Sequence, residues 1–358
     1  MRVFLISAFI SIVMFSIGWF SYAYVHRVSP RGATTDIKEV VSKPLEKYSI
    51  ENLQKANWQS GTFKVEKQIA DEKEYTSYLF TFTFNPEVEG TKKAKTTGQI
   101  NIPKGDGPFP LVLMFRGYVD QTMYSTGTGT RPAAKYFAEH GFMTIAPDFL
   151  GYAGSDTEAA NIFESRFQTY TTAVSLLKTI EQFKSDNKSP QVNSEIDGFS
   201  ELTNRLINYS SLSLWAHSNG GQIALTTLAI TGAKYPTTLW APASKPFPYV
   251  VLYFTDESND GGKFIRNELA KFEDVYDVDN YSYTNYIDTI DAPVQIHQGT
   301  ADDAVPIAWT NELVGKLKKA DKDVTYHTYP GADHNLRPSW DEVVAKDVEF
   351  FKKHNSEL

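Results

Sequence analysis

The sequence predicts an α/β fold, in which a mostly parallel open sheet carries helices on both faces. Three observations predict it. Short apolar runs alternate with helix-length segments from residue 111 to the C-terminus. Residues 111–115, LVLMF, are continuously apolar, which is typical of a strand buried on both faces. Residues 243–290 interrupt the alternation and are rich in Tyr, Phe, Asp and Asn, which indicates an insertion over the carboxyl ends of the strands, where such sheets bind ligands.

Length and composition suit one large α/β domain with an insertion. The chain has 358 residues, of which 41% are hydrophobic, so it can build a sizeable core. The formal net charge of −8 argues against a nucleic-acid partner. There are no cysteines, which excludes disulfides and thiolate metal sites. We expect neither a metal nor an organic cofactor.

The N-terminus begins with an uncharged apolar run. Residues 3–24 carry no charge, and a run of about 20 apolar residues can span a bilayer. We therefore expect residues 1–26 to be a transmembrane anchor, with residues 3–24 in the membrane and the rest of the chain outside the cytoplasm. The alternative is a signal sequence cleaved after Ala23, which would leave a secreted protein.

Residues 27–72 are mixed and polar, and we interpret them as a linker or stalk with one short helix, followed by the main domain at 73–358. Residues 75–84, YTSYLFTFTF, alternate in the manner of a half-buried strand. With residues 96–102 they predict an antiparallel edge. The parallel part is predicted as strands at 111–115, 142–146, 212–216, 238–240, 293–297 and 324–329, and helices at 131–140, 158–183, 220–231, 308–319 and 339–353.

A serine stands at the corner between one of these strands and the next helix. The segment 212–225, LSLWAHSNGGQIAL, contains A-H-S-N-G, a variant of G-x-S-x-G. That motif holds a serine on a sharp strand-to-helix turn with its hydroxyl exposed. Ser218 is therefore the predicted nucleophile. The alternative is a serine that merely caps the helix.

A serine nucleophile needs a base, and the base needs an orienting acid. Four histidines follow Ser218, and His334 is the one in a glycine-containing loop, YPGADHNLRP, between a strand and the last helix. Asp302 and Asp303 follow the strand at 293–297. We predict His334 as the base and Asp302 as the acid, with Asp303 as a helix cap or a neighbour.

The oxyanion that forms on acyl attack needs preorganised donors. We expect the N–H of Asn219, directly after the nucleophile, and the N–H of Tyr118 in the loop after the strand at 111–115. Ordinary surface roles for Arg116 and Tyr118 are the alternative.

A substrate pocket is expected from Arg116, His217, Phe247 and Tyr253. The last two belong to the aromatic insertion, which either shapes an apolar pocket or packs the core of a lid.

From about residue 95 the chain resembles the catalytic domain of the prolyl oligopeptidase family of α/β-hydrolases. The motifs that carry the resemblance are AHSNGG around Ser218, QGTADDAVP around Asp302, YPGADH around His334, and PDFLGYAGSD at 147–156. The resemblance implies an α/β-hydrolase fold and serine hydrolysis of peptides, and it places the triad acid at Asp302.

Three features depart from that family. There is no room for an N-terminal β-propeller, Phe115 stands where one branch has an oxyanion tyrosine, and Arg116 stands where many esterases have histidine. The expected function is thus a membrane-anchored serine hydrolase that cleaves short peptides or aminoacyl amides. Two alternatives remain: an ester hydrolase of the same fold, and a catalytically silent binding module.

Overall fold

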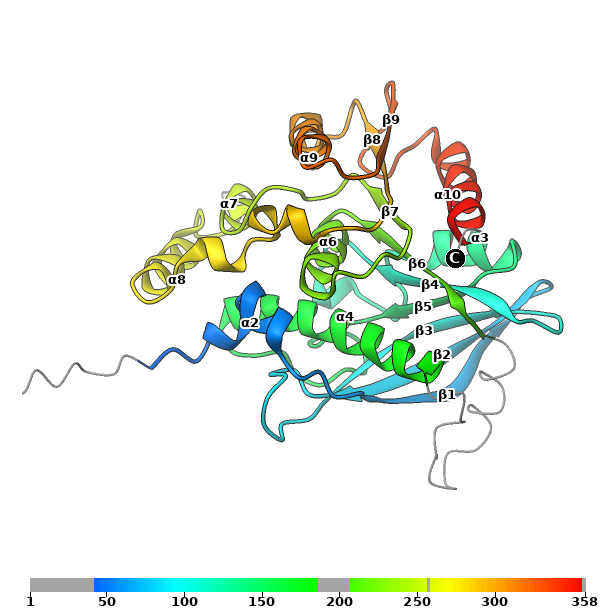
Figure 1. Ribbon diagram of the computed structural model, residues 1–358, viewed down its shortest axis with the longest axis horizontal. Helices are drawn as coiled ribbons and strands as arrows, with labels where there is room; N and C mark the ends of the chain where they lie inside the picture. Colours follow the sequence, from blue (N-terminus) through cyan, green and yellow to red (C-terminus); the bar gives the residue numbers. More distant parts are fainter. Residues whose placement is uncertain (1–41, 186–206, 256–257, 356–358) are drawn as a thin grey trace, which may run out of the picture. The chain divides into compact units, whose positions relative to one another are not determined.

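The computed structural model describes residues 42–185, 207–255 and 258–355. Residues 43–358 form one compact unit. Its centre is a nine-stranded sheet with the strand order β1-β2-β3-β5-β4-β6-β7-β8-β9 (Figure 1). The pairs β1–β2, β2–β3 and β3–β5 are antiparallel. The remaining pairs, from β5 to β9 along the sheet, are parallel.

Apart from β1, which falls in the expected linker, the strands follow the predicted pattern closely. The strands are β1 Thr62–Asp71, β2 Tyr75–Phe84, β3 Ala94–Pro103, β4 Phe109–Phe115, β5 Met143–Pro147, β6 Ile207–His217, β7 Thr237–Trp240, β8 Val294–Gly299 and β9 Val324–Tyr329. The predictions at 75–84 and 324–329 match to the residue, and the other predicted strands differ at their ends.

Helices cover both faces of the sheet, as expected (Figure 1). They are α2 Ile50–Lys55, α3 Arg131–Glu139, α4 Ile162–Ser185, α6 Asn219–Thr231, α7 Tyr249–Tyr253, α8 Lys263–Glu273, α9 Ile307–Lys319 and α10 Trp340–Asn355. Two core clusters divide the apolar side chains of β4 between the faces. Leu111, Leu113 and Phe115 pack with α4 and α6, whereas Val112 and Met114 pack with α3 and α10. The continuous apolar run of β4 follows from this two-sided burial.

The stretch expected as a linker contributes to the sheet and to the core. Residues 62–71 form β1, which pairs with β2 at the edge. Tyr48 and Leu53, before this strand, are fully buried in the core. Leu45 donates its N–H to the Tyr276 hydroxyl at 2.9 Å and accepts a hydrogen bond from the Tyr281 hydroxyl at 3.2 Å. The first residues of this unit are therefore fixed to the insertion.

The insertion between β7 and β8 is helical and aromatic. It contains α7, α8 and three short 3-10 turns at Val278–Tyr281, Tyr283–Asn285 and Ile287–Thr289. Phe247 lies at the centre of a cluster of rings that includes Phe163 and Phe167 from α4 and Phe272 from α8. The insertion is thus joined to the helices on that face of the sheet.

The transmembrane part of the predicted fold class needs correction. In the described ranges, no helix is both long and apolar enough to cross a bilayer. The helix α4 has sufficient length at 24 residues, but it carries Glu164, Arg166 and Lys178. The expected span at residues 3–24 lies outside the described residues.

Candidate active site

The backbone at Ser218 forms a sharp corner between β6 and α6. Ser218 has φ 56° and ψ −121°, a conformation that L-residues adopt only under constraint. Its N–H donates to the Trp240 carbonyl and its own carbonyl accepts from the N–H of Ala243, both at 2.9 Å. These main-chain bonds to the segment after β7 hold the strained conformation in place.

The glycines after the serine are required by close backbone packing. A Cβ placed on Gly220 would lie 2.0 Å from the carbonyl oxygen of Phe115, and one on Gly221 would lie 2.6 Å from the Cβ of Pro242. The helix α6 therefore starts in direct contact with the loop after β4. This is the physical reason for a small residue two positions after the nucleophile.

The structure brings His334 and Asp302 together. His334 Nδ1 lies 3.0 Å from both carboxylate oxygens of Asp302. His334 comes from the loop between β9 and α10, and Asp302 from the loop after β8. The two loops meet closely, because a Cβ on Gly299 would lie 2.2 Å from the carbonyl oxygen of Ala332.

The carboxylate of Asp302 is fully buried and fully engaged. Besides His334, it accepts hydrogen bonds from the N–H groups of Ala304 at 3.0 Å and Val305 at 2.8 Å and from Gln298 Nε2 at 2.8 Å. Burial alone would raise the pKa of Asp302, but the hydrogen bonds from His334 and Val305 outweigh it and lower the pKa. Asp302 is therefore an anion that can orient and stabilise an imidazolium.

Asp303 does not cap the next helix. Its side chain is exposed, and α9 begins after Pro306 without a side-chain cap. The sequence left these two aspartates adjacent, and the structure separates them by burial.

His217, the residue before Ser218, contacts the loop that carries His334. Nε2 of His217 donates to the main-chain oxygen of His334 at 3.0 Å, and the two rings are 4.8 Å apart. Burial and the neighbouring His334 lower the pKa of His217 to about 4, so its ring is neutral at pH 7. Within the described residues, no hydrogen bond joins the Ser218 hydroxyl to His334. Such bonds are often long in enzymes without substrate.

The loop after β4 stands against the nucleophile. A Cβ on Gly117 would lie 3.0 Å from the Cβ of Ser218 and 3.5 Å from its Oγ. The side chain of Tyr118 is 75% exposed, so it is the main-chain N–H of this residue, and not its ring, that we consider for the oxyanion. Asn219 is the first residue of α6, and its N–H therefore has no acceptor within the helix. Asn219 directly follows Ser218, and Tyr118 follows Gly117, which lies against Ser218; their roles as oxyanion donors stay predictions.

Arg116 supports this loop from beneath. It is 5% exposed, and its guanidinium donates to the carbonyl oxygens of Gly117 and Asp148, both at 2.9 Å. The guanidinium lies 3.9 Å from the ring centre of Tyr152 and 4.6 Å from that of Tyr124. Arg116, which we expected in a substrate pocket, is instead enclosed by aromatic rings and the main chain.

Sequence reasoning missed a second buried carboxylate in the same region. Asp148 is fully buried and accepts hydrogen bonds from the hydroxyls of Thr97 and Tyr124 at 2.6 Å and of Thr126 at 2.9 Å. The N–H of Gly127 adds a fourth bond at 3.2 Å. The signal was present in PDFLGYAGSD, whose aspartate directly follows a buried strand. Asp148 fixes the loop that carries Arg116 and Gly117.

The two aromatic residues expected in the pocket lie elsewhere. Phe247 is 1% exposed in the ring cluster of the insertion and is therefore a core residue. Tyr253 is 42% exposed on α7, and its ring centre lies 4.5 Å from that of Trp309. The aromatic insertion was expected either to shape an apolar pocket or to pack the core of a lid. Phe247 packs the core, because its buried ring is not accessible to a substrate.

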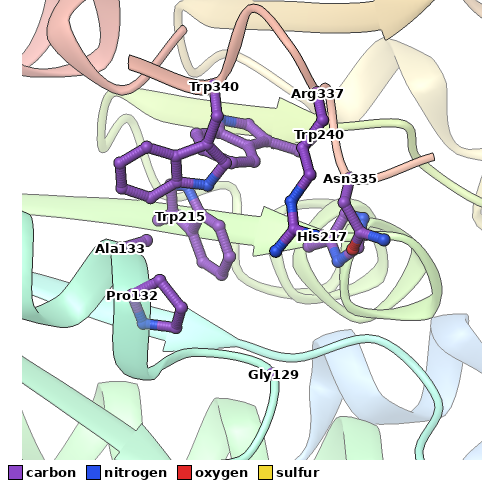
Figure 2. A pocket seen from close by; sticks show the side chains of 9 residues that line it. All are labelled: Gly129, Pro132, Ala133, Trp215, His217, Trp240, Asn335, Arg337 and Trp340. Atoms are coloured by element: carbon purple, nitrogen blue, oxygen red, sulfur yellow. The ribbon is translucent and has the colours of Figure 1, made fainter. Parts of the chain in front are cut away.

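A cavity of about 420 Å³ opens beside His217 (Figure 2). It lies among the start of α3, the ends of β6 and β7, and the loop that follows His334. Its lining is aromatic with a few polar groups, and consists of Gly129, Pro132, Ala133, Trp215, His217, Trp240, Asn335, Arg337 and Trp340. In the part of the chain that the structure describes, no cluster of three His, Asp or Glu side chains could hold a metal ion.

Comparisons with known proteins agree with this architecture. Residues 180–357 match the model of the prolyl oligopeptidase family. The search of curated proteins gave no match. Acetyl xylan esterase 1 from a Thermoanaerobacterium species has a similar structure, with a TM-score of 0.58, 14% identity, and coverage of 86% of this chain and 94% of that one.

Two further structures are similar. An acetyl xylan esterase from a Paenibacillus species has a TM-score of 0.57 and 15% identity, with coverage of 84% of this chain and 91% of that one. A puromycin-hydrolysing peptidase from Mycobacterium tuberculosis has a TM-score of 0.52 and 14% identity. The match covers 82% of this chain but only 39% of the peptidase. At such identities these likenesses show the fold alone. With the family match over residues 180–357, they identify the chain as a serine hydrolase of the α/β-hydrolase fold, with the prolyl oligopeptidase family represented in its carboxyl-terminal half.

Proposed function

We propose that this chain is a serine peptidase that cleaves short peptides or aminoacyl amides through an acyl-enzyme. Ser218 Oγ attacks the carbonyl carbon while His334 takes its proton, and the oxyanion lies against the N–H groups of Asn219 and Tyr118. Collapse of the intermediate breaks the carbon–nitrogen bond, and His334 returns the proton to the departing amine. Water then enters by the same route and releases the acid.

The observation that carries this proposal is the contact between the half-buried His334 and the buried carboxylate of Asp302. Nδ1 of the imidazole is held at 3.0 Å from both carboxylate oxygens, which leaves Nε2 as the nitrogen that exchanges protons. The anion stabilises the imidazolium that forms during attack. The strained corner at Ser218 supports the role of nucleophile, because a helix cap does not require a positive φ.

The choice of amides over esters is supported by the family match. Ester hydrolysis is the second candidate, and a different observation favours it. The two acetyl xylan esterases are covered over 94% and 91% of their length, so a catalytic unit of this size without a further large domain is found among esterases. The oxyanion site and the triad would serve both reactions, since both pass through a tetrahedral intermediate.

The experiment uses the full chain beside its Ser218→Ala variant on matched aminoacyl amides, prolyl amides and aryl esters. Amide cleavage that the variant lacks would support the peptidase. Cleavage of esters alone would favour the second candidate, because an ester needs less help with its leaving group. Equal behaviour of both proteins on every substrate would refute the assignment of Ser218 and leave a binding module.

A fluorophosphonate probe adds a test that needs no substrate. It should label Ser218 in the wild type, and peptide mass spectrometry should locate the adduct there. The variant Ser60→Ala changes an exposed serine and is the matched control, which should be labelled like the wild type.

A further inference from the structure

The cavity beside His217 adjoins the loop that carries the base, because Asn335 and Arg337 of that loop line it (Figure 2). His334 protonates the leaving atom in this type of reaction, so the leaving group lies close to its imidazole. His217, whose ring is 4.8 Å from that of His334, and Asn335, which follows it in the chain, both line the cavity. The cavity thus lies against two neighbours of the proton donor, whereas Asp302 contacts that donor at Nδ1.

The walls of the cavity are suited to a flat ring. The indoles of Trp215, Trp240 and Trp340 and the ring of Pro132 surround it. Trp240 and Trp340 meet edge to face at 5.9 Å, and Trp240 Nε1 donates to buried Asp347 at 2.7 Å. Trp240 is therefore held in a fixed orientation. Fixed aromatic walls bind planar apolar groups well.

The charge of the cavity is positive. Arg337 is the charged side chain among its described lining residues, and none of them is acidic. His217 is neutral at pH 7, because burial lowers its pKa to about 4. Within the described residues, the Arg337 guanidinium has neither an ion pair nor a hydrogen bond. Figure 2 shows that the side chains of Arg337 and Asn335 extend from the histidine loop toward His217.

The backbone that presents Arg337 is itself fixed. The carboxylate of Asp333 accepts from the N–H groups of Asn335 and Arg337, both at 2.9 Å. Trp215 adds an unpaired donor, since its Nε1 is buried without a hydrogen-bond partner among the described residues. Leaving such a donor unpaired costs free energy, and an acceptor on a bound ligand would remove that cost.

We propose that this cavity binds the leaving group of the substrate, and that this group is a planar or aromatic ring that carries a carboxylate. The ring lies between the indoles and the carboxylate pairs with Arg337. The inference rests on the proposed hydrolysis at Ser218 for its place in the reaction, and it adds the class of leaving group.

The test compares substrates that differ only in charge. The pairs are para-acetoxybenzoate with para-acetoxybenzamide, and para-alanylaminobenzoate with its carboxamide, so that both esters and amides are included. We expect the wild type to have a higher kcat/KM for the carboxylate of at least one pair. Arg337→Gln should lower the carboxylate-to-carboxamide ratio about tenfold, the usual scale for a charge-assisted hydrogen bond. Arg337→Lys should restore part of it.

Lys318→Gln is the matched control, because it removes an exposed positive charge from α9, outside the cavity. It should leave the ratio at the wild-type value. Equal preference of the wild type for the two members of every hydrolysed pair, or an unchanged ratio in Arg337→Gln, would overturn the proposal.

Binding measured without turnover separates this inference from the proposed function. Calorimetry on Ser218→Ala should show that para-hydroxybenzoate binds more tightly than para-hydroxybenzamide, and that adding Arg337→Gln removes the difference. Trp340→Ala should weaken both ligands. If no substrate is hydrolysed but this binding pattern is found, the proposed function fails and the carboxylate site stands. Absence of the pattern refutes the carboxylate site whether or not hydrolysis occurs.

Discussion

The imidazole of His217 donates its Nε2 hydrogen to the main-chain oxygen of His334 at 3.0 Å. The residue before the nucleophile thereby positions the loop that carries the base. Besides lining the cavity, His217 therefore acts on catalysis through the position of His334.

Replacement of His217 by phenylalanine should keep the ring and lose this hydrogen bond. We expect kcat to fall about tenfold with a small change in KM, and the free energy of unfolding to fall by about 1–2 kcal/mol. Steady-state kinetics and urea denaturation measure the two effects. His140→Phe, at an exposed histidine after α3, is the control and should match the wild type. Wild-type kcat in His217→Phe would show that the bond does not position the base.

The depressed pKa of His217 makes stability depend on pH in a defined window. Its ordinary pKa is 6.5 and the folded value is about 4, so between these values the unfolded chain binds more protons. The free energy of unfolding should therefore decrease as the pH falls from 6.5 to 4. The pKa of Asp302 is lowered from its ordinary value of 3.8, so the stability that this carboxylate contributes is lost only as the pH falls below that value.

Urea denaturation at several pH values tests this window. The gap in stability between the wild type and His217→Phe should narrow from pH 7.5 to pH 4.5, because the variant has no group to protonate there. A gap that stays constant would argue that His217 is not buried in its neutral form.

Asp302→Asn should keep the shape of the acid and remove its charge. We expect kcat to fall by about 10³- to 10⁴-fold, the scale seen when a triad acid becomes an amide and the histidine adopts the wrong tautomer. Asp303→Asn is a matched control at the adjacent, exposed carboxylate and should retain wild-type kcat. A larger loss in the control would transfer the role of acid to Asp303.

Asp148→Asn should loosen the loop that carries Tyr118, one of the two expected oxyanion donors. The amide keeps one oxygen, so either Tyr124 and Gly127, which bond Oδ1, or Thr97 and Thr126, which bond Oδ2, lose their acceptor. We expect a loss of about 2–3 kcal/mol in unfolding free energy and a fall in kcat that exceeds the change in KM. Denaturation and kinetics on the same preparation measure both. A stability loss with unchanged kcat would limit Asp148 to a structural role.

Gly220→Ala should disrupt the corner at Ser218. Its Cβ would lie 2.0 Å from the Phe115 carbonyl, which is backbone and cannot rotate away. The expected loss is about 3 kcal/mol or more. Gly315→Ala in α9 is the control, because nothing lies within 4 Å of its added Cβ. Alanine favours the helix there and should raise the free energy of unfolding by about 0.5–1 kcal/mol. Equal stability of the two variants would contradict the packing argument.

The parallel half of the sheet could be predicted because burial on both faces leaves a direct trace in the sequence. The run at 111–115 is such a trace, and the alternation at 75–84 likewise reflects the one-sided burial of β2 in the antiparallel part. Residues 62–71 escaped prediction because β1 is an edge strand with mostly exposed side chains, so its sequence resembles a polar linker. Tyr48 and Leu53 sit in short elements that offer too few residues for a period.

The candidate site was predictable where a motif fixes the backbone, as at Ser218, Asp302 and His334, which the fold brings to the carboxyl ends of the strands. The cavity could not be predicted, because its lining residues come from four segments that are distant along the chain. Phe247 and Arg116 looked available in the sequence, but each is enclosed by residues distant along the chain. Trp215 and Trp340, which line the cavity, carry no local signal that distinguishes them from core residues.

The two hydrogen bonds of Leu45 have a consequence for the order in which the molecule can assemble. Tyr276 and Tyr281 lie 231 and 236 positions further along the chain. During synthesis, Leu45 leaves the ribosome long before Tyr276 and Tyr281 are made. The contacts of Leu45 with the insertion therefore form only after both tyrosines have been synthesised. Closing a loop of this size is entropically unfavourable and slows folding. The first segment of this unit is therefore among the last to settle, and a nascent chain that stops short of the insertion cannot complete its core.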